Sequence, residues 1–336
     1  MKVLDMHCDT ILGLLEKEDK REIPSLLHND LSIDIEKMQK GDYLLQNFAL
    51  FTDQRKREIP EEETMCLYDM YCRMLEENKD SIAPVLTYSD IEKNQKEGKI
   101  SAMLTLEDGG VVFNSLAMLR NYYRMGVRMI ALTWNYENGI GFPNLLVNDI
   151  TYEDSKVPNL LQRVDTVNGL TDFGIQYIQE MERLGMIIDV SHLNDAGFYD
   201  VLDYTTKPFV ASHSNARAIC PVARNLSDDM ILELANRGGV MGLNFCGDFL
   251  ELHDYENGPS KVADMVKHIK YIRDLAGIDV IALGTDFDGI NCELEIQDAS
   301  QMAKLEKALY EEGFTKEEVE KIFYKNALRV YKEVLK

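Results

Sequence analysis

The 336 residues include 45% hydrophobic side chains, enough to bury a large core in one barrel-sized domain or in two smaller ones. Lys and Arg number 36 against 58 Asp and Glu, and the net charge of −22 would repel phosphate backbones and anionic lipid, so neither nucleic acid nor a membrane is expected as a partner. The six cysteines are scattered without a CxxC pair, which indicates free thiols. Because we identify neither a signal peptide nor a run of ~20 apolar residues, we expect a cytoplasmic enzyme.

Short apolar runs rich in β-branched residues alternate with longer amphipathic stretches along the chain, which is typical of strands and helices around a parallel sheet. The eight predicted strands cover residues 2–8, 45–51, 100–106, 129–134, 186–190, 209–212, 240–245 and 280–284. Helices are predicted at 115–125, 172–184 and 228–237, and further helices between 299 and 335. No repeat, linker or break in composition divides the chain. The sequence therefore predicts an α/β fold, a single (β/α)8 TIM barrel over residues 1–336, with the C-terminal helices packed against it.

The first and third predicted strands end in side chains that suit a metal. In a (β/α)8 barrel, functional groups come from the C-terminal ends of the strands. Because side chains two apart on a strand share a face, His7 and Asp9 can both point inward and offer one metal two ligands. Glu107 follows the third strand before a glycine turn, and a carboxylate can bridge two cations. Taken singly, His7 and Asp9 could be a chance pair, and Glu107 a surface acid that caps the next helix.

The fifth and sixth predicted strands both finish in Ser-His, and this is the most specific local signal. His192 and His213 lie in equivalent settings, one βα repeat apart, and two imidazoles at neighbouring strand ends suit a second metal. A single histidine is more often a core or surface residue. Imidazole beside oxygen ligands favours zinc, although manganese, cobalt or iron could occupy the same set.

The last predicted strand runs into Asp286-Phe287-Asp288-Gly289. Asp286 is the first acid beyond the apolar run, where it could accept a proton from an activated water. Asp288 is the weaker candidate and is expected to orient the loop. The remaining histidines lie in polar or helical surroundings and are interpreted as non-ligands: His28, His253 and His268.

In combination these motifs resemble the membrane dipeptidase (renal dipeptidase) family, peptidase family M19, over nearly the whole chain and in the same order. The shared segments are His7/Asp9, Glu107 to Gly110, His192, His213, Ala216-Arg217, Arg224-Asn225-Leu226, residues 239–245 and residues 286–289.

The resemblance implies a binuclear metal-dependent dipeptidase of the metal-dependent hydrolase type of barrel. It implies that His7 and Asp9 hold one divalent metal, that His192 and His213 hold the other, and that Glu107 bridges both, with zinc as the expected metal. It further implies that Arg224 binds the substrate carboxylate, since a guanidinium pairs with carboxylate through two hydrogen bonds, and that Asp286 is the acid/base. Tolerance for a C-terminal D-residue and a homodimer are also implied. From the residues alone, a surface cation near an acidic helix start would be the preferred interpretation of Arg224.

One departure from the family concerns the fourth strand. Family members such as the mammalian renal enzyme have a histidine after Leu-Thr, and this chain has Trp134, its only tryptophan. Because an indole cannot reproduce the imidazole, either Asn135 or a neighbouring loop group compensates, or the substrate range differs. We therefore take Trp134 and Asn135 as candidate substrate-binding residues. Asp108, an extra acid before the glycine turn, is a smaller departure that affects the shape of the loop.

The functional hypothesis is hydrolysis of dipeptides by a water that two metals activate, with Asp286 moving the proton to the leaving amine. One alternative is another amidohydrolase-type barrel acting on a lactone, phosphotriester or amino-heterocycle, but such sites usually begin with HxH rather than HxD. The other alternative is a catalytically silent metal or peptide binder, for which Trp134 is the only indication.

Overall fold

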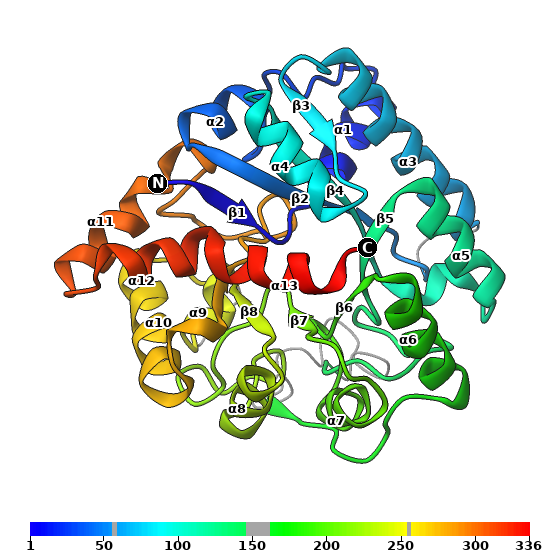
Figure 1. The fold of residues 1–336 in the computed structure, drawn as a ribbon, viewed down its shortest axis with the longest axis vertical. Helices are drawn as coiled ribbons and strands as arrows, with labels where there is room; N and C mark the ends of the chain where they lie inside the picture. Colours follow the sequence, from blue (N-terminus) through cyan, green and yellow to red (C-terminus); the bar gives the residue numbers. More distant parts are fainter. Residues whose placement is uncertain (56–58, 146–161, 254–256) are drawn as a thin grey trace.

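The computed structural model describes residues 1–55, 59–145, 162–253 and 257–336. In this part of the chain the strands form one parallel sheet in the order β2-β1-β9-β8-β7-β6-β5-β4-β3, and an additional pairing of β2 with β4 closes it. The closed ring is an eight-stranded barrel surrounded by helices (Figure 1). The predicted (β/α)8 fold is confirmed.

The eight barrel strands correspond one to one with the eight predicted strands. They are β1 (Val3–Asp5), β2 (Tyr43–Phe51), β4 (Ile100–Glu107), β5 (Val127–Ala131), β6 (Ile187–Asp189), β7 (Val210–Ala211), β8 (Val240–Leu243) and β9 (Ile281–Leu283). Sequence reasoning missed β3 (Ile82–Pro84), which pairs with the start of β4 outside the closed ring. Its three residues end in proline and are too few to show a periodic pattern.

The predicted helices at 115–125, 172–184 and 228–237 are α5 (Leu116–Met125), α6 (Asp172–Leu184) and α8 (Asp228–Asn236). The other helices in the described residues are α1 (Thr10–Asp19), α2 (Ile35–Lys40), α3 (Pro60–Glu77), α4 (Tyr88–Lys96), α7 (Asp195–Tyr204), α9 (Gly247–Leu250), α10 (Val262–Ala276), α11 (Ala303–Glu311), α12 (Lys316–Glu320) and α13 (Asn326–Val334). None of the described helices has the length and apolar character needed to cross a membrane.

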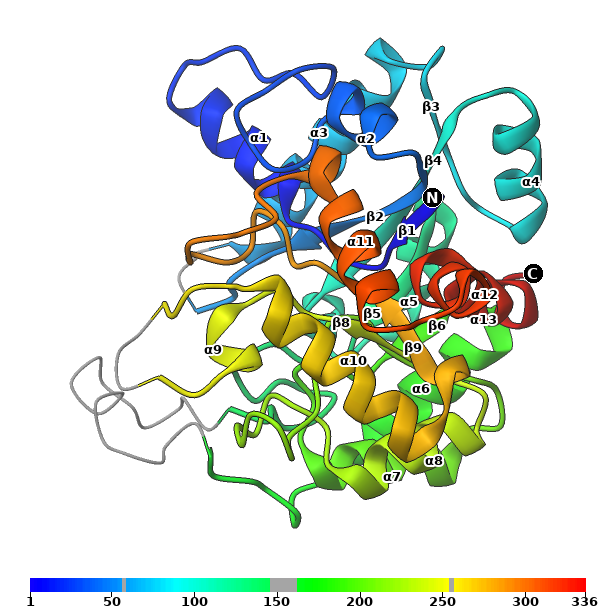
Figure 2. The same cartoon turned by 90° about the vertical axis from the view of Figure 1, so that its left-hand side faces the viewer.

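The C-terminal helix α13 closes the N-terminal end of the barrel. Its residues Val330, Tyr331 and Val334 join one buried cluster with the apolar side chains that fill the barrel, among them Leu4 and Met103. Figure 2 shows α13 and both chain termini at one end, with α9 at the opposite end. Since one end is sealed by apolar packing, the loops that follow the strands surround the only mouth left for polar chemistry in the described part of the barrel.

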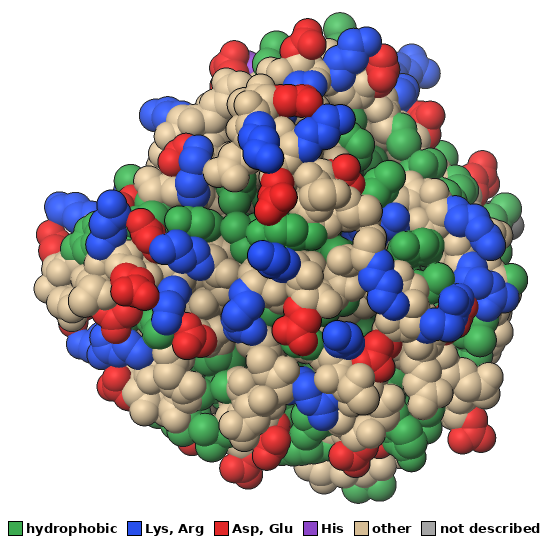
Figure 3. Space-filling model, in the orientation of Figure 1, with side chains coloured by type: hydrophobic (Ala, Val, Ile, Leu, Met, Phe, Trp, Pro, Cys, Tyr) green, Lys and Arg blue, Asp and Glu red, His purple; other side chains and the backbone are tan. Residues whose placement is uncertain are grey.

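On the face that α13 covers, the charged side chains of both signs are mixed. Figure 3 shows Lys and Arg interspersed with Asp and Glu over this end of the molecule. The excess of acidic residues in the chain is therefore not gathered into one negative patch here.

Two glycines allow β7 to lie close to its neighbours just before His213. A Cβ on Gly242 of β8 would lie 1.9 Å from the Ser212 carbonyl oxygen, and a Cβ on Gly284, just after β9, would lie 1.7 Å from the same oxygen. Real Cβ atoms do not approach backbone this closely. The backbone that carries His213 is therefore held in place by two positions where only glycine fits.

We expect Gly242→Ala to lower the free energy of unfolding by about 1–3 kcal/mol or more, because the added methyl overpacks against backbone that cannot move away. Thermal or denaturant unfolding checks this. Gly13→Ala is the matched control, since the atoms nearest to its Cβ would be those of the flexible Leu31 side chain. Equal stability of the Gly242→Ala variant and the wild type would contradict the close approach.

Candidate metal centre and active site

The five predicted metal ligands lie together at the C-terminal mouth of the barrel. His7 Nε2 lies 3.3 Å from Asp9 Oδ2 and 3.4 Å from Glu107 Oε2. On the other side, Glu107 Oε1 lies 3.0 Å from His192 Nε2 and 3.6 Å from His213 Nε2. The two carboxylate oxygens of Glu107 thus face different groups of ligands. This is the arrangement that a bridging carboxylate between two cations requires.

Asp286 lies in the same cluster. Its Oδ1 is 3.8 Å from His7 Nε2, and His7, Asp9 and Asp286 form one of two groups whose ligand atoms lie within 4.8 Å of one another. The other group is His7, Glu107 and His213. His7 therefore belongs to both groups.

The backbone is unusual at two of these positions. His192 has φ of 68° and Asp286 has φ of 63°, in the left-handed region that residues other than glycine rarely adopt. Each lies just beyond a strand, so the chain turns sharply there and directs the side chain into the mouth. Such strain persists only where surrounding contacts hold it and is typical of functional sites. Sequence patterns do not reveal it.

Hydrogen bonds from outside the cluster orient three of its members. His192 Nδ1 lies 3.0 Å from Asn135 Oδ1, and His213 Nδ1 lies 2.7 Å from Ser212 Oγ. Asn244 Nδ2 donates to Asp286 Oδ2 at 2.9 Å. Sequence reasoning missed Ser212 and Asn244 as supporting residues, although both lie in the quoted Ser-His and Gly-x-Asn-Phe segments. In each pair the partner outside the cluster holds a ring or carboxylate in one orientation.

The electrostatics of the cluster favour a cation. The pKa of Glu107 is raised to about 7, because burial, together with the negative charge of Asp9, outweighs the opposing effect of His7. Burial also raises the pKa of Asp286. Burial lowers the pKa of His192 and His213 well below the usual value, and the positive charges of Arg224 and His7 add to this. The carboxyl groups therefore need positive charge, and both imidazoles are neutral, as metal ligands must be.

Two details show that these residues fit metal ions. The Nε2 atoms of His192 and His213 lie only 3.0 Å apart, and since both Nδ1 atoms are engaged elsewhere, two lone pairs point into one small space. Asp9 Oδ1 is buried and has no hydrogen-bond partner among the described residues. Cations satisfy both conditions. We therefore expect His7, Asp9, Glu107, His192 and His213 to hold them.

Arg224 lies beside the cluster and is almost completely buried, with 1% of its surface exposed. Its Nη1 donates to Ser214 Oγ at 2.7 Å, while Nε and Nη2 have no hydrogen-bond partner in the described part of the chain. Burial lowers its pKa, and the charges of Asp286 and Glu107 counteract this. A buried guanidinium with two unused donors is suited to a carboxylate that arrives with a ligand. This placement excludes the surface-cation interpretation.

Trp134 and Asn135 lie at the edge of the site. The Trp134 ring is 4.8 Å from that of Phe51 and 5.2 Å from that of Tyr136, and its centroid is 6.4 Å from His192. Asn135 contacts His192 directly through its amide oxygen. The tryptophan thus belongs to an aromatic wall, and Asn135 supports a histidine of the cluster.

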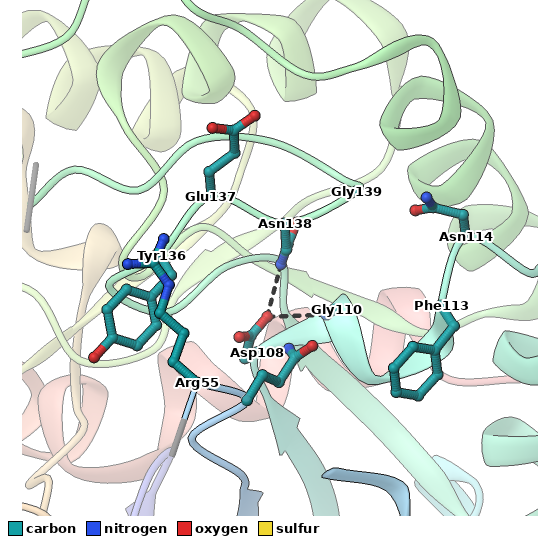
Figure 4. Close-up of a pocket in the computed structure, with 10 residues that line it drawn as sticks. Arg55, Asp108, Gly110, Phe113, Asn114, Tyr136, Glu137, Asn138 and Gly139 are labelled. Carbon is teal, nitrogen blue, oxygen red and sulfur yellow. Dashed lines mark hydrogen bonds between the residues drawn. The ribbon is translucent and has the colours of Figure 1, made fainter. Parts of the chain in front are cut away.

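A pocket of about 210 Å³ opens next to this wall (Figure 4). Its lining includes Arg55, whose guanidinium carbon lies 4.1 Å from the centroid of the Tyr136 ring. Asp108 has φ of 72°, and its Oδ1 accepts hydrogen bonds from Gly110 N at 2.9 Å and from Asn138 Nδ2 at 2.6 Å. The extra acid therefore shapes the loop after β4 and does not join the metal cluster.

Asp288 and the three remaining histidines lie outside the cluster of predicted metal ligands. Asp288 accepts hydrogen bonds from Thr10 Oγ1 at 2.6 Å and Ser32 N at 2.7 Å, so it orients the loop, as expected. His268 is buried, and its ring bonds to the backbone of Ala216 and Leu250. His268, His28 and His253 lie outside the groups of possible metal ligands in the described residues.

The fold and the site define a metal-dependent hydrolase built on a (β/α)8 barrel. The chain belongs to the family described as membrane dipeptidase (peptidase family M19), which it matches over residues 1–336. This family membership supports a metal-dependent dipeptidase activity.

Several individual proteins are similar to this chain. An uncharacterized protein of Klebsiella pneumoniae, from the region 5′ of pqqA, is 35% identical over 250 residues, which are 74% of this chain and 88% of that protein. An uncharacterized dipeptidase of Schizosaccharomyces pombe is 35% identical over 241 residues, 71% of this chain and 54% of the yeast protein. A metallopeptidase of Rhodobacter sphaeroides, solved with a phosphinate mimic of the dipeptide L-Ala-D-Ala, shares the fold with a TM-score of 0.89 at 23% identity, and 99% of each chain is covered.

The affinity for zinc should rise with pH between about 6 and 8. A metal must displace the protons of Glu107, with its pKa of about 7, and of His7, whose pKa rises well above the usual value because attraction to Glu107 and Asp9 outweighs burial. Below pH 7 each displaced proton lowers the affinity about tenfold per pH unit. His192 and His213 do not compete in this range, since their pKa values are lowered.

Titration calorimetry with a competing chelator, in buffers of different ionisation enthalpy, measures both the affinity and the protons released. An affinity that is constant from pH 6 to 8, with no proton release, would contradict this assignment.

Proposed function

We propose that the protein hydrolyses the peptide bond of dipeptides, including those with a C-terminal D-residue, with a water activated by two divalent metals, zinc being the expected ion. The observation that carries the proposal is the position of Arg224: a buried guanidinium with two unused donors beside the histidine and carboxylate cluster. Together they offer a binding group for a carboxylate next to a centre suited to hydrolysis. The Rhodobacter sphaeroides structure with a mimic of L-Ala-D-Ala supports the same substrate class.

In this proposal His7 and Asp9 hold one metal, His192 and His213 hold the other, and Glu107 lies between them. When bound, the metals supply Lewis acidity and lower the pKa of water from ~15.7 toward ~7, so that a nucleophile exists at neutral pH. Asp286 accepts the proton of the attacking water and passes it to the leaving amine. The pKa of Asp286 is raised by burial, which suits a group that must both take and release a proton.

Arg224 sets the length of the substrate. If its Nε and Nη2 bind the free C-terminal carboxylate, the peptide bond one residue away is the one presented to the metal cluster, and a C-terminal extension would move the carboxylate away from that bond. Asn244 keeps Asp286 directed toward the reacting bond by donating to its Oδ2. We assign Trp134 to the wall that faces the substrate, and Asn135 acts there through His192.

Chelation of the metals should abolish hydrolysis of dipeptides, and added zinc, manganese or cobalt should restore it. The measurement combines metal analysis with release of amino acids from a library of L,L- and L,D-dipeptides. Turnover that survives complete metal removal would overturn the mechanism. Two metals per chain without turnover of any dipeptide would favour the silent binder instead.

Asp286→Asn should retain the metals and lower kcat by about 10²–10⁴-fold, because the amide cannot take up the proton. Asp288→Asn is the matched control: it changes the same chemistry two residues away, at a carboxylate that bonds to Thr10 and Ser32. Steady-state kinetics and metal content are measured for both variants. Near-normal turnover of Asp286→Asn would remove Asp286 from its role.

A further inference from the structure

A chain of hydrogen bonds extends from the metal cluster into the barrel wall behind His213. Ser212 Oγ lies 2.7 Å from His213 Nδ1 and also donates a short hydrogen bond to Asp189 Oδ2. Asp189 Oδ1 accepts from the backbone N–H groups of Ser191 at 2.9 Å and Ser212 at 2.8 Å. Ser212 is fully buried, and Asp189 is 1% exposed. Three of these atoms, His213 Nδ1, Ser212 Oγ and Asp189 Oδ2, therefore form a continuous path that is buried from solvent.

The direction of these bonds follows from counting protons. A carboxylate accepts only, so the single hydroxyl proton of Ser212 points to Asp189. The Ser212 oxygen can then only accept from His213, which requires the His213 proton to be on Nδ1. Nε2 is left with its lone pair, directed toward Glu107 Oε1 at 3.6 Å and His192 Nε2 at 3.0 Å. The chain of bonds thus selects the one tautomer of His213 that can bind a metal in the cluster.

The neighbouring histidine is supported differently. His192 Nδ1 bonds to the neutral amide oxygen of Asn135, which lies on the loop after β5. Behind His213 the hydroxyl relays the negative charge of Asp189, which strengthens hydrogen bonds along the path and makes the imidazole a better donor to a cation. Two histidines that face the same space therefore receive unequal support, one from a loop amide and one from a buried carboxylate.

The same carboxylate arrangement occurs between β1 and β9, without a histidine at its end. Asp5 Oδ1 accepts from the N–H groups of His7 and of Thr285 at 3.3 Å and 2.8 Å, and Asp5 Oδ2 accepts from Thr285 Oγ1 at 2.7 Å. In both places a buried aspartate ties the end of its own strand to the next strand in the ring. Only at Ser212 does the hydroxyl also contact an imidazole. Thr285 therefore serves as a control for Ser212, because its hydroxyl bonds to an aspartate in the same way but does not contact a histidine ring.

We propose that Ser212 and Asp189 are positioning residues that hold His213 in the tautomer with its proton on Nδ1 and thereby strengthen metal binding at the His192/His213 half of the site. This inference rests on the proposed metal centre, but not on the choice of dipeptides as substrate. Ser212 and Asp189, which do not themselves bind a metal, thus increase the affinity for the metal at His192 and His213.

The test compares Ser212→Ala with Thr285→Val in the full chain. Both variants remove a buried hydroxyl that donates to an aspartate, and only the first removes a contact with an imidazole. The affinities of both metals are measured with zinc alone, by competition with a chelator. Ser212→Ala should weaken the binding of one zinc about 10–100-fold and leave the other within a few fold. Thr285→Val should leave the zinc at His192 and His213 within a few fold of the wild type.

A second readout needs no metal. In metal-free protein labelled with ¹⁵N at histidine, the pattern of ring couplings distinguishes a proton on Nδ1 from one on Nε2. We expect His213 of the wild type and of Thr285→Val to carry the proton on Nδ1, and Ser212→Ala to show a mixture of tautomers. Thermal unfolding of both variants reports the structural cost separately.

The inference is overturned if Ser212→Ala binds both zinc ions as the wild type does, or if both variants lose affinity equally, since the tie would then be only structural. Failure of the proposed function looks different. A wild type that binds two zinc ions tightly and cleaves no dipeptide would refute the dipeptidase assignment, while the zinc affinities and the tautomer of His213 still decide the role of Ser212.

Discussion

The buried carboxylate of Glu107 is the group on which the arrangement of the barrel mouth depends. Its oxygens face His7 on one side and His192 and His213 on the other. Burial raises its pKa to about 7 although the charge of His7 opposes this, so the ionised form is costly in the metal-free cluster. Removing charge from water is costly unless an opposite charge compensates for it. The same burial that destabilises the metal-free cluster therefore favours the cations that we propose it binds.

The rest of the barrel holds this unfavourable cluster in place. His192 and Asp286 have left-handed backbone, which persists only where neighbouring contacts determine it. Gly242 and Gly284 fix the backbone of Ser212 from two sides, while α13 seals the opposite end with apolar side chains. Packing at one end of the barrel thus offsets strain and desolvation at the other. This division is expected for a parallel barrel, whose stability and chemistry lie at opposite ends.

The sequence predicted the barrel and the groups at its mouth because both depend on local patterns. Apolar runs mark the strands, and a polar residue directly after a run marks the mouth. The supporting residues could not be predicted in this way, because each bonds to a residue that follows a neighbouring strand. Asp189 of β6 accepts a hydrogen bond from the residue after β7, and Asn244, after β8, donates to Asp286, after β9. Spacing along the chain does not show which strands are neighbours. β3 was missed for a simpler reason, since three residues ending in proline form no pattern. The burial of Arg224 also required the fold, because the sequence around it equally suits a surface loop.

Trp134 shows how a departure from the family pattern can be absorbed. An indole at this position cannot supply the hydrogen bonds of an imidazole, and Asn135 Oδ1 is already engaged with His192, so the adjacent amide oxygen does not replace them. The Trp134 ring instead packs between Phe51 and Tyr136, and the guanidinium of Arg55 lies over Tyr136. An aromatic surface next to a pocket thus stands where the family has a polar contact. Because neither the cluster nor Arg224 depends on that contact, we propose that the change affects which substrate side chains bind rather than the reaction itself.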